Sequence, residues 1–309
     1  MTAIALHESG ATTGPVERGL HFSPRTQFQL TRGKAYPVMG LGIFFGSLEV
    51  LVRDDYEFPA WHAAGLFAIS AGPLPDDWKF VLWDGVAASY GNPKREWAAM
   101  WGYDALVADT SHSDGLLEYH VEPLRIFFRE WELRRTALDE GTAGEEFRYI
   151  RDTEAAGRDD RGRDSLAAIC LRELPETAGP IDCGRHASSG TRFALTRGTV
   201  YPVMGLGIVE ASLEALVRDD SGEPCWCPAG LFDIPAAPLP RDWGFALWDG
   251  VAASYGHPTG EWAAMWGYDA LVSERTHSDA LTARDAEALR TFHREWERRR
   301  AAITNEGYT

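Results

Sequence analysis

Three groups of residues have the types and the spacing that chemistry could use. The first is the run His112-Ser113-Asp114, which recurs as residues 277–279 and would offer a base, a nucleophile and a carboxylate for hydrolysis. Members of a catalytic triad, however, converge from separate elements, and no G-x-S-x-G motif accompanies this run. A Ser or Asp that caps a helix beside a histidine is the ordinary interpretation. We therefore predict no catalytic residue, and hydrolase activity is only a second alternative.

The second group contains cysteines, which could bind zinc. Cys225 and Cys227 flank Trp226, and Cys170 and Cys183 could complete a set of four ligands. Zinc sites favour pairs of cysteines that are separated by two to four residues, so a C-x-C pair is a poor match. We predict no metal site and no cofactor.

The third group is the pair of adjacent carboxylates Asp54 and Asp55, which recurs as Asp219 and Asp220. Catalysis by two carboxylates requires that they face each other across a cleft and that one of them is desolvated. Adjacent aspartates between two apolar runs are typical of a solvated hairpin turn. We interpret both pairs as turn formers.

The elements that must position these residues are encoded twice. Residues 28–135 and 193–300 align at a constant offset of 165 without a gap, and roughly two-thirds of the pairs are identical, which indicates a tandem duplication. All 12 Trp lie inside the two copies. We expect a loose leader over residues 1–25, one module over 26–135, a charged linker over 136–192 with a short helix at 165–174, a second module over 193–302 and a tail over 303–309.

Within each copy, strands are predicted to precede helices. The first copy has apolar, β-prone runs separated by turn residues, and these predict strands at 36–43, 48–53, 59–61 and 78–83. Residues 64–69 are expected to form a tight corner and a further strand. The run 96–101 places Trp97, Met100 and Trp101 at helical spacing. A second helical piece is expected at 103–107. The last helix should start at Ser113 or Asp114 and run to Arg135, with a break near Pro123.

The strand region of each copy resembles an SH3-like barrel. In the first copy the resemblance is carried by Gly33, Tyr36, Val38, Asp54, Asp55, Pro59 and Leu66-Phe67. It implies an α+β fold in which each copy is a small antiparallel SH3-like barrel followed by C-terminal helices. Compact acidic modules of this kind are also similar to bacterial immunity or self-resistance proteins, which act by binding. That similarity implies a protein that neutralises or sequesters a protein partner.

Tryptophan is the residue type best suited to such binding, because its ring is large and amphipathic. We expect Trp61 and Trp97 to be exposed anchors, and His112 to be a polar contact if it lies near Trp97 or Tyr103. The candidate binding residues are Trp61, Trp78, Trp97, Tyr103, His112, Trp226, Trp243, Trp262, Tyr268 and His277. A pocket lined by these tryptophans would instead favour a small aromatic or sugar-like ligand, which is the alternative function.

The composition restricts the partners. A formal charge of −16 disfavours binding to phosphate backbones and favours a basic protein partner. The chain shows no signal peptide, no apolar run long enough to span a membrane and too few cysteines for a disulfide scaffold. We therefore expect a cytoplasmic protein that binds neither nucleic acid nor membrane.

Differences between the copies cluster at residues 56–63 and 108–123. Tyr56-Glu57-Phe58 corresponds to Ser221-Gly222-Glu223, and residues 117–120 correspond to Thr282-Ala283-Arg284-Asp285. Surface segments diverge most easily, so neutral drift explains this clustering. The alternative is that the two modules contact different surfaces.

Overall fold

The same set of elements occurs twice in this computed structural model, which describes residues 1–8, 25–88, 96–139, 165–171, 193–210, 212–253 and 261–305. Module 1 consists of β1 (Thr2–Ala5), β2 (Ala35–Pro37), β3 (Gly40–Phe44), β4 (Ser47–Arg53), β5 (Pro59–Ala63), η2 (Ala64–Leu66), β6 (Phe67–Ile69), β7 (Gly72–Pro73), β8 (Lys79–Leu82), β9 (Trp97–Gly102), α1 (Asp104–Ala108), α2 (Thr110–Leu117) and α3 (Val121–Asp139). Module 2 consists of β10 (Leu166–Cys170), β11 (Val200–Val203), β12 (Gly205–Val209), β13 (Ser212–Arg218), β14 (Pro224–Pro228), η4 (Ala229–Leu231), β15 (Phe232–Asp233), β16 (Ala237–Pro238), β17 (Gly244–Leu247), β18 (Trp262–Gly267), α5 (Asp269–Ser273), α6 (His277–Thr282) and α7 (Ala286–Asn305).

The fold is mixed α+β, and its sheets are antiparallel and open. A six-stranded sheet has the order β16-β8-β9-β3-β4-β5, and its counterpart has the order β14-β13-β12-β18-β17-β7. Two smaller sheets have the orders β2-β1-β6 and β11-β10-β15. Because the six-stranded sheets end in free edges, the closed barrel that the SH3-like resemblance implies is not what these strands form.

Each six-stranded sheet takes its last strand from the other module. Strand β7 of module 1 pairs with β17, and β16 of module 2 pairs with β8. Reciprocal backbone hydrogen bonds run from Leu48 N to Ala253 O (3.1 Å) and from Leu213 N to Ala88 O (3.0 Å). The two modules are therefore not independent units, because each completes the sheet of the other.

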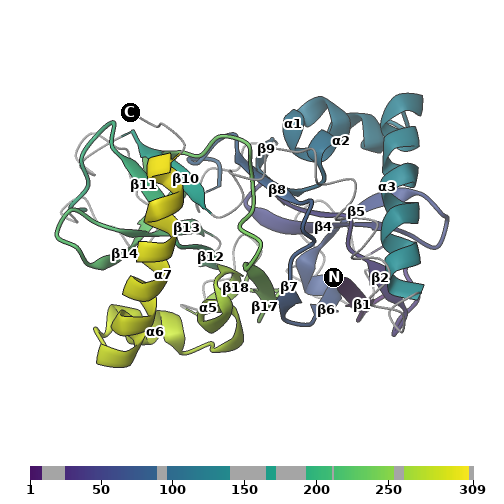
Figure 1. Ribbon diagram of the computed structural model, residues 1–309. Coiled ribbons are helices and arrows are strands. Elements are labelled where there is room, and N and C mark those ends of the chain that lie inside the picture. The colour runs from purple at the N-terminus through teal and green to yellow at the C-terminus, as the bar shows by residue number, and fades with distance from the viewer. Residues whose placement is uncertain are drawn as a thin grey trace.

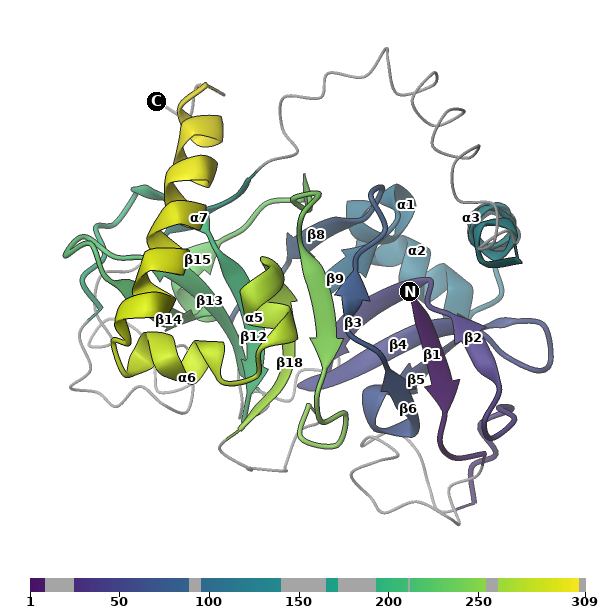
Figure 2. The same cartoon turned by 60° about the horizontal axis from the view of Figure 1, so that its bottom comes forward.

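The molecule has four layers. One continuous apolar core, with residues from both modules, lies between the two six-stranded sheets, and two smaller cores lie between each sheet and its own helices. Figure 1 and Figure 2 both show α3 on the right and α7 in the left half of the molecule, with β8, β9 and β18 between them. Within the described part of the chain, no helix is both long and apolar enough to cross a membrane.

Burial on both faces explains the strand sequences. In β4, Leu48 and Val50 face the core between the sheets, whereas Leu51 faces the helices. Strand β9 was expected to be a helix. A register shift between β3 and β9 places a bulge there, so that Trp97 and Met100 face the helices together. The bulge therefore produces the i, i+3 spacing that resembles a helical face.

Two further predictions at the start of each module were wrong. Residues Thr2–Ala5, expected in a loose leader, form the central strand of the β2-β1-β6 sheet. Residues Leu166–Cys170, expected in a short helix, form the equivalent strand β10, with alternating burial. Ala3 pairs with Tyr36 and Ala168 pairs with Tyr201, so the offset of 165 extends to these strands. Residues 9–24 of the expected leader lie outside the described residues.

The predictions for the helices agree better with the structure than those for β1, β9 and β10. The helical piece at 103–107 is confirmed as α1. The long helix is divided as Pro123 suggested, but the break falls at residues 118–120, before the proline. The cap of α2 is Asp109, whose Oδ1 accepts a hydrogen bond from Ser111 N (2.7 Å), rather than Ser113 or Asp114.

Candidate functional site

The tryptophans predicted as anchors do not form the surface. Trp61 and Trp97 are only 7% and 5% exposed, and their rings pack at 4.4 Å between centroids under the helices of module 1. Their counterparts Trp226 and Trp262 are partly buried and pack in the same way at 4.4 Å. Trp78 and Trp243 are fully buried in the core between the sheets. The prediction that Trp61 and Trp97 are exposed was wrong, because packing against helices buries both faces of their strands.

His112 lies near Tyr103, as the sequence suggested, but the pair is buried and does not line a groove. The Tyr103 hydroxyl and His112 Nε2 are 2.7 Å apart, and Tyr268 and His277 repeat this bond at 2.9 Å. Burial lowers the pKa of His112. The hydroxyl of Ser113 is buried and makes no hydrogen bond in the structure, so it is not coupled to the histidine. These residues hold α2 against the sheet and do not assemble a nucleophile with a base.

The cysteines and the paired aspartates also have clear positions. Cys225 and Cys227 lie on the same face of β14, and among the described residues no three His, Cys, Asp or Glu side chains come together as a metal site. Cys183 lies outside the described residues. Asp54 Oδ1 accepts hydrogen bonds from the backbone N–H groups of Tyr56 (2.9 Å) and Phe58 (3.0 Å). Asp54 therefore shapes the β4–β5 hairpin, as expected of a turn former.

A patch of exposed apolar side chains forms at that hairpin. The β4–β5 turn presents two aromatic rings, and the turn between α2 and α3 presents three apolar side chains. We define the module-1 patch as Tyr56 (65% exposed), Phe58 (43%), Leu117 (52%), Tyr119 (59%) and Val121 (82%). The rings of Phe58 and Tyr119 meet edge to face with centroids 5.4 Å apart, which joins the two turns. Exposed apolar side chains that gather from two turns are typical of an interaction surface.

Both turns contain a residue with a left-handed backbone conformation. Tyr119 follows the end of α2, where Tyr119 N donates to Leu116 O (3.3 Å) and His120 N donates to Gly115 O (2.8 Å). These two bonds form a Schellman motif, whose left-handed position is normally a glycine. Tyr119 occupies it with φ 57°, and Glu57 adopts φ 70° in the hairpin turn. A side chain in this conformation costs about 1–2 kcal/mol, so the patch is held at some expense of stability.

Module 2 has the same turns without the patch. Its equivalents of the five patch residues are Ser221, Glu223, Thr282, Arg284 and Ala286. Arg284 repeats the left-handed conformation with φ 59°, which shows that the turn is preserved. The surface difference between the modules therefore comes from the side chains and not from the backbone.

Acidic side chains surround the module-1 patch. Glu57 and Glu118 stand between patch residues, and Glu122 follows Val121; the side chains of all three are more than 60% exposed. Some of this charge is compensated, because Arg53 pairs with Glu57 and Arg125 pairs with Glu122 at 2.6 Å. The patch is thus an apolar centre with an acidic rim.

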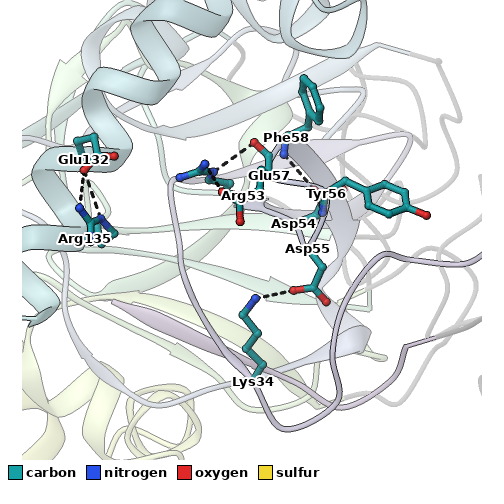
Figure 3. A network of polar contacts seen from close by, with 9 residues as sticks. All are labelled: Lys34, Arg53, Asp54, Asp55, Tyr56, Glu57, Phe58, Glu132 and Arg135. Atoms are coloured by element: carbon teal, nitrogen blue, oxygen red, sulfur yellow. Dashed lines mark hydrogen bonds and ion pairs between the residues drawn. The ribbon is translucent and has the colours of Figure 1, made fainter.

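A groove with a volume of about 370 Å³ lies beside the hairpin. It is lined by Thr2, Lys34, Ala35, Tyr36, Pro37, Arg53, Asp54, Glu57, Trp131 and Arg135. The Arg53 guanidinium stacks on the Trp131 ring at 4.0 Å, and Lys34 Nζ contacts Asp55 Oδ1 at 2.5 Å. Figure 3 shows Arg53 beside Glu57 at the hairpin, and Arg135 beside Glu132 on α3. Trp131 was not among the predicted binding residues.

Comparison of the chain with protein-family models, with curated proteins and with solved structures finds no match. The site therefore has to be interpreted from its own residues. One sequence signal did indicate it, since the two segments in which the copies diverge, 56–63 and 108–123, are those that meet at the module-1 patch.

Proposed function

We propose that this chain is a non-catalytic binding protein of the immunity or sequestration type, which neutralises a protein partner through the module-1 patch. The observation that carries the proposal is the contact between Phe58 and Tyr119. It unites two exposed apolar turns, and the two residues are 61 positions apart in sequence and correspond to Glu223 and Arg284 in module 2. Neutral drift does not require the two divergent segments to meet on one surface.

The chemistry of the partner follows from the patch and its rim. An apolar centre that includes two tyrosines is typical of the buried core of a protein interface. Exposed carboxylates at Glu57, Glu118 and Glu122 favour a partner whose own apolar surface is bordered by Lys or Arg. A net charge of −16 favours the same partner at long range.

Cytoplasmic location and an SH3-like, though open, arrangement of the strands are part of this proposal. Cys225 and Cys227 are thiols in the structure, with their sulfur atoms 3.4 Å apart, which is compatible with a reducing compartment. Sheets of short antiparallel strands with functional hairpin turns are compatible with an SH3-like binding module.

A second candidate function is supported by the groove, whose volume falls in the range of small-ligand sites. A small aromatic ligand would contact the exposed part of Trp131, and Lys34 would contact an anionic substituent. This candidate differs from the tryptophan-lined pocket expected from sequence, because Trp61, Trp78 and Trp97 do not line the groove.

The two candidates are separated by matched variants that introduce module 2 residues into module 1. We would capture partners from native lysate with the tagged full-length chain, with Phe58→Glu/Tyr119→Arg and with Lys34→Thr. A protein retained by the wild type and by Lys34→Thr, but not by the double variant, supports the proposal. A small molecule seen by native mass spectrometry, and lost only in Lys34→Thr, would replace it with the second candidate.

A further inference from the structure

We propose that Cys225 and Cys227 form a redox-active dithiol in module 2, which a low-molecular-weight disulfide oxidises to an internal disulfide. The two sulfur atoms are 3.4 Å apart, and the Cys227 thiol donates a hydrogen bond to Cys225 Sγ. The residues are two positions apart on β14, so their side chains leave the strand on the same face. This site is independent of the module-1 patch.

The geometry of an extended strand permits a disulfide between these cysteines but places it under strain. Alternate Cα atoms of an extended strand are about 6.6 Å apart, near the upper end of the range for disulfides. Among the described strands, β14 lies at the edge of its sheet and pairs only with β13, so it can bend without breaking a second set of described ladder bonds. A disulfide formed under strain is more easily reduced than a structural one, which suits a reversible reaction.

The two thiols have different environments that fit the two steps of exchange. Cys225 is partly exposed, and the hydrogen bond from Cys227 lowers the pKa of its thiol, although burial opposes the shift. Cys227 is fully buried, and burial raises the pKa of its thiol. Cys225 therefore ionises more readily and can attack an external disulfide, and the sulfur of Cys227 lies close enough to attack Cys225 in turn.

The reaction is ordinary thiol–disulfide exchange. The Cys225 thiolate attacks one sulfur of the external disulfide, which breaks its S–S bond and releases one thiolate. Cys227 then gives up its proton and attacks Cys225 Sγ in the mixed disulfide, which releases the second thiolate. The dithiol loses two electrons and two protons in total, and the external disulfide is reduced to two thiols.

The fluorescence of Trp226, which lies between the two cysteines, should report the oxidation. Formation of the bond shortens the distance between the sulfur atoms from 3.4 Å to about 2.05 Å and must bend the strand around Trp226. The ring of Trp226 packs on Trp262 with centroids 4.4 Å apart, so its fluorescence should change. Module 1 has Ala60 and His62 at the equivalent positions and cannot undergo this reaction.

The test places the full-length chain in buffers with increasing ratios of oxidised to reduced glutathione, followed by acid quenching and peptide mass analysis. We expect the peptide that contains both cysteines to lose two hydrogens, together with a change in tryptophan fluorescence. Cys225→Ala, which copies Ala60, should show neither change, and Cys227→Ser should stop at a glutathione adduct on Cys225.

Three results would overturn the proposal. The first is that both thiols of the wild type remain free at the most oxidising ratio. The second is a glutathione adduct that persists on Cys225 although Cys227 is present. The third is a loss of two hydrogens that also occurs in Cys225→Ala, because the bond would then involve other cysteines.

Discussion

The indole rings of Trp101 and Trp266 stack on each other with centroids 4.4 Å apart and planes only 7° from parallel. The two residues are equivalent in the duplication, since they are separated by the offset of 165. Both are fully buried in the core that the modules share. A residue that stacks on its own counterpart lies at the axis that relates the two modules, so the two sheets are arranged as in a symmetric dimer.

Removal of either ring should destabilise the whole molecule. We expect Trp101→Ala and Trp266→Ala each to lower the free energy of unfolding by about 3–5 kcal/mol, because each leaves a large cavity in the shared core. In a double-mutant cycle the two should be coupled by about 0.5–1.5 kcal/mol, the typical value for an aromatic pair. Chemical denaturation measures both values. Two separate unfolding transitions, with only one affected by each substitution, would contradict a shared core.

Close packing between the modules predicts a contrast between two glycines. A Cβ at Gly85 would lie 2.5 Å from the carbonyl oxygen of Ala229 in the other module, whereas a Cβ at Gly72 would have no atom within 4 Å. We expect Gly85→Ala to lower the free energy of unfolding by about 1–3 kcal/mol through overpacking. Gly72→Ala, its matched control, should leave stability nearly unchanged. Equal effects of the two substitutions in thermal denaturation would show that the modules are not packed as described.

Buried carboxyl groups predict a fall in stability with rising pH. Burial raises the pKa of Glu49 to about 8, and burial, with a smaller contribution from Cys225, does the same for Glu214. Both carboxyls are neutral in the folded protein near pH 7 but ionised when it unfolds. The stabilisation they contribute is complete below about pH 4.5 and is lost as the pH rises to about 8, at roughly 1 kcal/mol per pH unit for each group.

The best window for this measurement is pH 6.5–8. Burial lowers the pKa of His62 to about 4, so stability from this group is lost only as the pH falls below about 6.5. Glu49→Gln should flatten the dependence of the free energy of unfolding on pH between 6.5 and 8. Glu214→Gln should do so to a similar extent. An unchanged slope in both variants would mean that the carboxyls are ionised in the folded protein.

The sequence predicted the strands and the short helix α1 better than it predicted their assembly. Runs such as Leu48–Arg53 are rich in apolar residues, so these strands could be located from the sequence without knowledge of their pairing partners. The exchange of β7 and β16 could not be predicted, because each consists of two residues and pairs with a strand of the other module. Strand β9 was missed because its bulge produces helical spacing, and β1 was missed because four residues carry little periodicity.

The candidate site was indicated by divergence and not by residue type. Tryptophan was chosen because it is typical of interfaces, but two-sided burial of the sheets places Trp61 and Trp97 beneath helices. Among the residues that the structure describes, the aromatic side chains classed as exposed are instead Tyr56, Phe58 and Tyr119. The sequence could show that residues 56–63 and 108–123 differ between the copies, but only the fold shows that they meet.

The most direct test of the central claim is the affinity of the captured partner for matched variants of the full chain, measured by isothermal titration calorimetry. We expect one partner per chain, with binding at least about tenfold weaker for Tyr119→Arg, because an aromatic residue at the centre of an interface typically contributes 2 kcal/mol or more. Arg284 adopts the same backbone conformation in module 2, so this variant should keep its fold. Arg284→Tyr, the reverse exchange in module 2, should bind like the wild type. Equal affinity of the wild type and Tyr119→Arg would contradict the assignment of the module-1 patch as the binding surface.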